Sequence, residues 1–196
     1  MCKQTEHICF SLPAWVKGFI DSCSTLPSVE ARMALVIEAA RQNVLRDTGG
    51  PFAAAVFERD SGLLVSLGVN QVVNEGLSML HGEMMALSLA QRKLQTWNLD
   101  QQGLPVLELV TSTEPCAMCL GAVCWSGARR VVSGATEVDA RKLGFDEGPK
   151  PDDWVEALRQ RGIDVLPAVL RDEAVDVLEL YRQQGGVIYS PGRSRG

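Results

Sequence analysis

The sequence lacks several features that would place it at once in a specialised class of protein. No apolar run approaches the ~18 residues that a membrane-spanning helix needs. The N-terminal residues carry an early acidic residue and no sustained apolar core, which is unlike a secretory signal. Internal repeats and low-complexity tracts are also missing. These absences favour a cytoplasmic protein with no membrane contact.

Basic residues are too few for a protein that grips a polyanion. The chain has 19 Lys and Arg against 24 Asp and Glu, a net charge of −5. Binding to a phosphate backbone depends on Lys and Arg that displace counterions. The balance makes nucleic acid an unlikely partner, although it does not exclude a local basic patch.

Histidine is scarce, and cysteine is not needed to hold the fold. Only His7 and His81 are available to a histidine-dependent site, whereas there are six cysteines. A chain of 196 residues is one domain and buries roughly 70% of its unfolded surface, so it needs no disulfide to build a core. In a reducing compartment, closely spaced cysteines such as Cys116 and Cys119 more often form a metal or redox site.

Apolar periodicity predicts an alternating α/β domain over residues 28–196, preceded by an N-terminal extension, residues 1–27, that shows no clear period. Ser28 is a suitable N-cap for the first helix. The segment 70–80 reads as irregular. Strands that alternate with helices predict helices on both faces of one sheet. Strands are expected at 52–57, 63–69, 106–111, 130–133 and 163–166, and helices at 28–46, 83–95, 113–126, 135–142, 154–160 and 172–184.

His81, Cys116 and Cys119 form the constellation that carries chemistry. The two cysteines lie three residues apart at a predicted helix start, so both sulfurs project from one side of its first turn. The positive helix N-terminus favours thiolates, which are the form that zinc binds. One imidazole and two thiolates give three protein ligands and leave the fourth tetrahedral position for water. We therefore expect one catalytic zinc per chain.

Glu83, two residues after His81, is placed beside that metal without needing to ligate it. Such a carboxylate can take a proton from an activated water and deliver it to a substrate. The order H-x-E followed by P-C-x-x-C is the signature of the zinc deaminases. A lone C-x-x-C would equally suit a redox pair, half of a structural zinc site or two core cysteines, so the combination with His81 decides the interpretation.

At these residues the chain resembles the cytidine deaminase-like superfamily of zinc-dependent deaminases, and within it the bacterial guanine deaminases. The likeness runs from about residue 32 to residue 189. It is carried by GPFAAAVFERDSG (50–62), HGEMMALSLA (81–90), TSTEPCAMCLGAVCWSG (111–127) and GFDEGP (144–149). It implies a three-layer α/β/α sandwich around a mixed five-stranded sheet, and a homodimer.

The resemblance also implies roles for residues outside the zinc constellation. Asn70 would bond the purine edge, Phe52 would stack on the ring and Trp125 would line the pocket. Glu147, on the FDEGP loop, would lie near the exocyclic amine and help ammonia depart. The family usually has H-A-E, so Gly82 is a departure, although its backbone N–H could still face the substrate.

The expected reaction is hydrolytic deamination of a nucleobase, with guanine giving xanthine and ammonia. Three alternatives stay open. One is a deaminase of another aminated heterocycle, such as an aminotriazine, cytosine or a nucleoside. A tRNA adenosine deaminase shares the motif but would need a cationic surface. A non-catalytic zinc-stabilised module would normally need four protein ligands, and no fourth is obvious.

Overall fold

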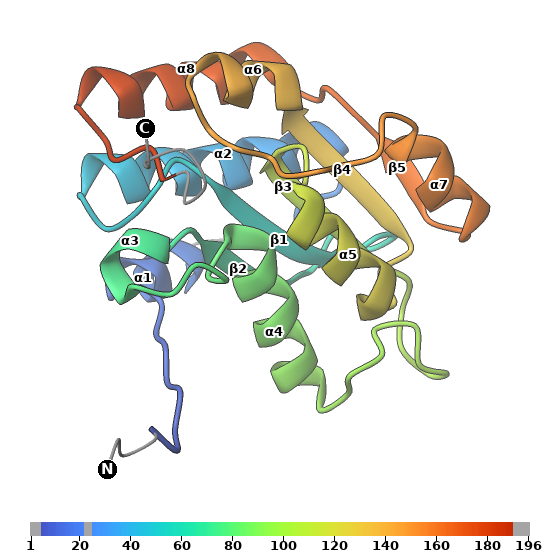
Figure 1. Cartoon of the computed structure of the whole chain (residues 1–196). Coiled ribbons are helices and arrows are strands. Elements are labelled where there is room, and N and C mark those ends of the chain that lie inside the picture. Colours follow the sequence, from blue (N-terminus) through green and yellow to red (C-terminus); the bar gives the residue numbers. More distant parts are fainter. Residues whose placement is uncertain (1–4, 22–24, 190–196) are drawn as a thin grey trace.

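The computed structural model describes residues 5–21 and 25–189 (Figure 1). The strands are β1 (Ala53–Glu58), β2 (Leu64–Val69), β3 (Leu107–Thr113), β4 (Arg130–Ala135) and β5 (Asp164–Leu166). The longer helices are α2 (Val29–Leu45), α4 (Gly82–Leu94), α5 (Ala117–Ser126) and α8 (Arg171–Gln183). The shorter helices are α1 (Trp15–Asp21), α3 (Val72–Glu75), α6 (Glu137–Lys142) and α7 (Trp154–Gln160).

The five strands form one mixed sheet in the order β2-β1-β3-β4-β5. β1 pairs antiparallel with both β2 and β3. β3, β4 and β5 run parallel, which requires the crossover helices α5 and α7 between them. The predicted mixed five-stranded sheet is therefore confirmed.

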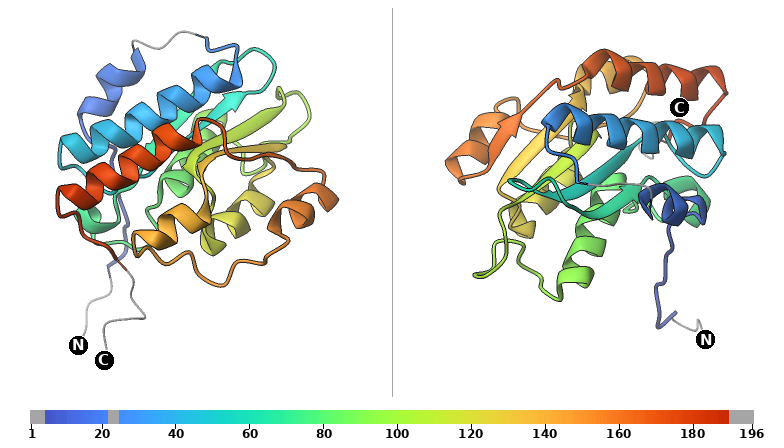
Figure 2. Two further views of the ribbon diagram at one scale, coloured as in Figure 1. Left: turned by 90° about the horizontal axis from the view of Figure 1, so that it is seen from above. Right: turned by 180° about the vertical axis from the view of Figure 1, so that it is seen from behind.

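Helices cover both faces of the sheet (Figure 1). α2 and α8 lie side by side on one face, and α4 and α5 lie on the other, as the turned views of Figure 2 also show. The strands alternate accordingly: in β1, Ala55 and Phe57 pack toward α2, whereas Ala54 and Val56 pack toward α4. Two apolar cores result, one on each face, and the architecture is the predicted three-layer α/β/α sandwich.

The structure departs from the predicted elements in three places. Residues 15–21 form helix α1, although their sequence showed no clear period, and Val16 is 1% exposed in the core. A short helix, α3, interrupts the segment expected to be irregular. β3 continues to Thr113 because its parallel pairing with β4 extends to Ala135, so the next helix begins at Ala117 instead of 113.

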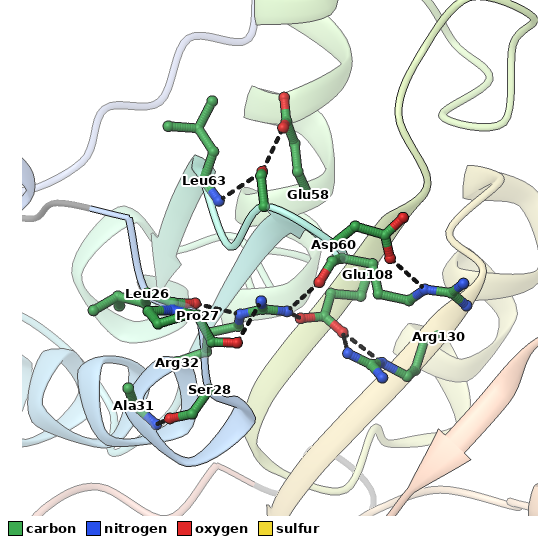
Figure 3. A network of polar contacts seen from close by, with 12 residues as sticks. Leu26, Pro27, Ser28, Ala31, Arg32, Glu58, Asp60, Leu63, Glu108 and Arg130 are labelled. Atoms are coloured by element: carbon green, nitrogen blue, oxygen red, sulfur yellow. Dashed lines mark hydrogen bonds and ion pairs between the residues drawn. The ribbon is translucent and has the colours of Figure 1, made fainter.

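A buried ion-pair network joins α2 to the middle of the sheet (Figure 3). Glu108 of β3 is fully buried and contacts two cations, Arg32 of α2 at 2.5 Å and Arg130 of β4. Arg32 also donates to the backbone carbonyls of Leu26, at 2.7 Å, and Arg59, at 2.9 Å. Because every charge has a partner, burial of the network is tolerated, and removing one partner would leave an uncompensated charge.

Among the described residues, no helix combines the length and apolar character needed to cross a bilayer.

Candidate metal centre and active site

Two helix N-termini converge on the site. His81 is the N-cap of α4 and Cys116 is the N-cap of α5, and neither side chain caps its own helix. Both side chains are therefore free to face outward from the helix ends. Cys119 lies in the first turn of α5 and is fully buried. β3 ends at Thr113 and is soon followed by Cys116, the N-cap of α5. The sheet thereby places the P-C-x-x-C segment next to the H-x-E segment at the start of α4.

The three predicted ligands lie together. The ligand atoms of His81, Cys116 and Cys119 are all within 4.8 Å of one another. His81 Nδ1 is 3.5 Å from Cys116 Sγ and 3.6 Å from Cys119 Sγ. Tetrahedral zinc with bonds of about 2.3 Å to sulfur and about 2.0 Å to nitrogen would place these atoms about 3.6 Å apart. The donor set and its spacing therefore fit zinc.

The surroundings of Cys116 favour its thiolate form. The Cys119 thiol donates a hydrogen bond to Cys116 and, with His81, lowers the pKa of Cys116 to about 4. The same hydrogen bond, together with burial, raises the pKa of Cys119. Burial opposes a proton on His81, but its hydrogen bond with Cys116 and the charge of Glu83 raise the pKa of the imidazole overall. The pocket is thus built to hold positive charge among these groups.

Glu83 lies in the first turn of α4 and is 6% exposed. Burial, followed by the charge of Cys116, raises the pKa of its carboxyl to about 7. Glu83 lines the same pocket as His81 and Cys116 but is not one of the three grouped ligands. Glu83 therefore lies beside the ligand group without belonging to it, and its part in the reaction stays a prediction.

Glu147 enters the pocket from the loop between α6 and α7. It is 5% exposed, and burial is the first cause that raises the pKa of its carboxyl to about 8. Its backbone carbonyl accepts a hydrogen bond of 2.9 Å from Ala117 N. The loop that resemblance singled out is therefore attached to the first turn of α5, and its acidic side chain faces the ligand group.

The mouth of the pocket is a hollow of about 310 Å³, the lower end of the size of small-ligand sites. It shares His81, Cys116, Glu147 and Tyr189 with the inner pocket. Met118 also lines it. Access to the ligand group is therefore from the side on which α5 and the Glu147 loop meet the C-terminal segment.

Tyr189 is a site residue for which the sequence analysis proposed no role. Its hydroxyl accepts a hydrogen bond of 2.7 Å from Asn70 Nδ2, and its ring packs edge-on to His81. Burial raises the pKa of the phenol. Asn70 is fully buried at the end of β2 and reaches the pocket through this contact. The only sequence signal for Tyr189 was an aromatic residue in a polar tail, which says nothing about its distant partners.

Phe52 and Phe145 form an aromatic wall of the pocket. Their ring centroids are 4.8 Å apart in an edge-to-face arrangement. Phe52 was predicted to line the site. Phe145, one residue after Gly144 in the FDEGP segment, was not assigned a role. The sequence signal that could have found Phe145 was an aromatic residue directly before the acidic pair Asp146 and Glu147.

Thr113 and Glu114, the residues just before Pro115 and Cys116, also line the pocket. Thr113 is 4% exposed, and its hydroxyl has no hydrogen-bond partner in the described part of the chain. A buried hydroxyl without a partner is costly unless a ligand or water satisfies it. Thr113 is therefore a candidate contact for the substrate.

Trp125 is where the structure contradicts the sequence analysis. Its side chain is 84% exposed, and it borders a different hollow together with Trp97 and Cys124. α5 is 10 residues long, so Cys116 at its N-cap and Trp125 near its C-terminus are far apart along the axis. Trp125 does not line the pocket of its own chain.

Gly82 lies against the sheet. A Cβ at this position would be 3.0 Å from Ala53 Cα and 3.2 Å from Ala54 N, which is tighter than ordinary packing. Glycine in place of the usual alanine of H-A-E therefore allows α4 to approach β1 closely. The contact fixes the start of the helix between His81 and Glu83.

With this geometry established, comparison with known proteins identifies the family. Residues 27–135 match the family described as the cytidine and deoxycytidylate deaminase zinc-binding region. A curated guanine deaminase of Bacillus subtilis is 32% identical over 118 residues, which are 60% of this chain and 71% of that protein.

Solved structures match over nearly the whole chain. A structure of guanine deaminase from Nitrosomonas europaea is 47% identical, covers 93% of this chain and 100% of its own, and has a TM-score of 0.88. A structure in complex with 2,6-diaminopurine is 50% identical, covers 92% of this chain and 95% of its own, and has a TM-score of 0.87. The chain belongs to the cytidine and deoxycytidylate deaminase zinc-binding family and is a zinc-dependent hydrolytic deaminase.

Proposed function

We propose that the chain is a guanine deaminase, which hydrolyses guanine to xanthine and ammonia. The observation that carries the proposal is the buried pair of carboxyls, Glu83 and Glu147, on one pocket with the group His81, Cys116 and Cys119. Similarity to guanine deaminases over nine-tenths of the chain supports the choice of base. The group offers the three protein ligands of a catalytic zinc instead of the four of a structural one.

Zinc bound by His81 and the two cysteines would supply an activated water, with its pKa lowered toward about 7. Glu83 would accept one proton from the attacking water, whose oxygen forms the new bond to the ring carbon that bears the amine. Glu83 then returns the proton to the adjacent ring nitrogen. Glu147 would bond the exocyclic amine. The second proton of the water, from the new hydroxyl group on the ring carbon, would pass through Glu83 and Glu147 to this amine, and the carbon–nitrogen bond then breaks to release ammonia and leave a carbonyl.

The remaining pocket residues suit a flat, polar base. Phe52 and Phe145 supply an apolar wall. The amide of Asn70 donates to the Tyr189 hydroxyl and accepts a hydrogen bond from Val72 N, so it would bond a purine edge by exchanging the Tyr189 contact for the base. The unpartnered hydroxyl of Thr113 offers a further hydrogen bond. A site built from such bonds rejects a base that leaves them unmade.

Two further properties belong to the proposal. We propose that the protein is a homodimer. Trp97, in the loop after α4, and Trp125, near the end of α5, line one hollow and are 79% and 84% exposed, and a second copy of the chain would cover them. We also propose a cytoplasmic location. It is supported by the free thiols of Cys116 and Cys119, which a zinc site requires and a reducing compartment preserves.

The experiment that tests the activity is an ammonia-release assay with zinc-loaded protein across guanine, adenine, cytosine, their nucleosides, aminotriazines and a tRNA anticodon stem. Guanine is expected to react fastest, and adenine, which lacks the 2-amino group, far more slowly. Glu83→Gln should retain about one zinc and lose activity by about 10² or more. Release of ammonia from cytosine or tRNA but not from guanine would overturn the choice of substrate.

A second measurement separates the enzyme from a zinc-stabilised module. His81→Ala and Cys116→Ala should each lose the metal, as determined by metal analysis of the purified protein. Full activity in a metal-free variant would contradict the zinc mechanism. Normal turnover by Glu83→Gln would remove Glu83 from it.

A further inference from the structure

Lys150 is a buried cation that the mechanism does not use. Its side chain is 1% exposed, and its ammonium lies 2.9 Å from a Glu137 carboxylate oxygen and 3.3 Å from Glu114 Oε2. It also lies 4.8 Å from the centre of the Trp154 ring, a cation–π distance. Burying an ammonium is costly, so a lysine enclosed by two carboxylates and an aromatic face is held in one position.

The cluster around Lys150 joins segments that meet at the active site. Glu114 immediately precedes Pro115 and Cys116, and it lines the pocket. Glu114 Oε2 also accepts a hydrogen bond of 3.0 Å from the backbone N–H of Glu137, the first residue of α6. Lys150 therefore ties the far end of the Glu147 loop to the turn that carries a zinc ligand.

The same loop is held at its other positions. Phe145 is 3% exposed and anchors its beginning among aromatic rings. Arg141 donates to the carbonyl of Gly148 at 3.0 Å, and Ala117 N donates to the carbonyl of Glu147. Gly148 has φ +70, and a Cβ there would lie 3.1 Å from Ala117 Cβ. Glu147 thus lies between an apolar anchor two residues before it and an ionic anchor three residues after it.

We propose that Lys150 is a positioning residue for the deamination, which acts by fixing the loop 145–150 so that the Glu147 carboxyl stays beside the reacting amine. This rests on the proposed function of Glu147. Lys150 does not line the pocket and does not belong to the group of metal ligands. Its effect passes through the backbone of the loop and through Glu114.

The chain offers a matched control in its other buried network. Arg130 also supplies one of two cations around a buried carboxylate, Glu108, which keeps Arg32 when Arg130 is removed. Likewise Glu137 keeps Arg141 when Lys150 is removed. Lys150→Met and Arg130→Met therefore each delete one of two cations around a carboxylate, Arg130 being 21% exposed, but only Lys150 lies next to the active-site loop.

The test compares these two variants as zinc-loaded proteins. Lys150→Met should keep about one zinc and lower kcat for guanine by about 10-fold or more, with KM within about threefold, because Asn70 and Phe52 still bind the base. In a Glu147→Gln background the same change should cost less than about twofold, since its effect passes through Glu147. Arg130→Met should lower the melting temperature without this loss of kcat.

Hydrogen exchange gives a readout that does not depend on the substrate. The amides of Gly148 and Lys150 should exchange about 10-fold faster or more in Lys150→Met, while those of β3 and β4 stay protected. Should Lys150→Met not fold, Glu137→Gln removes the closer of the two carboxylate partners and should change the same quantities in the same direction.

The outcomes separate the two proposals. A wild-type protein without guanine activity whose loop amides still loosen only in Lys150→Met would overturn the substrate, while the anchoring of the loop would stand. Unchanged loop exchange, an unchanged kcat, or a kcat loss that simply adds to that of Glu147→Gln would overturn the positioning role.

Discussion

At the scale of single residues, Thr113 offers the pocket a hydroxyl group that has no hydrogen-bond partner among the described residues. Its hydroxyl is buried and unpartnered among the described residues, and replacing it with a methyl group of similar size would remove that polar atom. We expect Thr113→Val to raise KM for guanine about 5- to 12-fold, the equivalent of one hydrogen bond of about 1–1.5 kcal/mol. Thermal stability should be equal or slightly higher.

Steady-state kinetics and a melting curve on the same preparation check this expectation. Thr113→Ser is the matched variant, because it retains the hydroxyl and should keep KM near the wild-type value. A wild-type KM in Thr113→Val would show that the substrate does not use this group.

The residue scale also shows what the sequence could and could not predict. His81, Glu83, Cys116 and Cys119 were identifiable because their chemistry depends on short local spacings at two helix starts. Tyr189 was not, since its contact with Asn70 joins residues 119 positions apart. Trp125 was misplaced because a motif records which residues are near in sequence, whereas the opposite ends of one helix face different surroundings.

At the scale of elements, α4 can reach the sheet only because Gly68 of β2 lacks a side chain. A Cβ at this position would lie 2.5 Å from Ala86 N and would also collide with the backbone carbonyl of Gly82. We expect Gly68→Ala to push α4 away from β2 and to lower stability by about 1–3 kcal/mol, the usual cost of overpacking. His81 and Glu83 would move with the helix.

Urea unfolding and zinc content measure the two consequences of Gly68→Ala. His81 lies at the start of α4, whereas Cys116 and Cys119 lie at the start of α5. A shift of α4 would separate the ligands, so zinc occupancy should fall together with the free energy of unfolding. Gly121→Ala on α5, where a Cβ would meet nothing within 4 Å, is the control and should be neutral or stabilising. Equal behaviour of the two variants would contradict the role of close packing at Gly68.

The junction of α6 and α8 predicts a pH dependence. Asp139 closes the capping box of α6 with Thr136 and accepts two hydrogen bonds from Arg171, the first residue of α8. The Arg171 guanidinium is the main cause that lowers the pKa of Asp139 to about 2. Because this pKa is lower than the ordinary 3.8, the stability that the charge contributes is complete above about pH 4 and is lost as the pH falls toward 2.

Asp139→Asn should therefore be less stable than the wild type at pH 7, by about 1 kcal/mol or less for a pair that is partly exposed to solvent. The difference should shrink between pH 4 and pH 2. Urea unfolding of the metal-free proteins measures it, since the zinc ligands would add a pH dependence of their own. A difference that stays constant down to pH 2 would show that the carboxylate charge is not what stabilises this junction.

Element boundaries illustrate why the fold was more predictable than its details. α2 begins at the expected cap, since the Ser28 side chain accepts a hydrogen bond from Ala31 N. Local signals of this kind lie within one turn of the residue they affect. The extension of β3 to Thr113 instead depends on its pairing with Ala135, a contact that no local pattern of residues encodes. Likewise α1 is stabilised by tertiary contacts: Val16 is buried in the core, and Trp15 Nε1 donates a hydrogen bond to the Thr48 hydroxyl.

At the scale of the whole molecule, the two exposed tryptophans predict association. Trp97 and Trp125 border one hollow together with Ala128, and a monomer that exposed both rings would leave a large apolar patch in water. Tryptophan is also among the residues that contribute most to protein interfaces when a partner buries it. We therefore expect the purified chain, of 21.3 kDa, to sediment as a species of about twice that mass.

Trp125→Glu should shift this equilibrium to the monomer, because a dimer would have to bury the introduced carboxylate at the interface. Leu45→Glu is the control, since Leu45 is 52% exposed at the end of α2, on the opposite face of the sheet, and should keep the wild-type mass. Sedimentation over a range of protein concentrations distinguishes the cases. A wild-type protein that stays monomeric at tens of micromolar would remove the homodimer from the proposal, and a dimer that survives Trp125→Glu would have to use another face. Activity measured on the same samples would then show whether the monomer, whose pocket already contains the zinc ligands and both carboxyls from one chain, is sufficient for deamination.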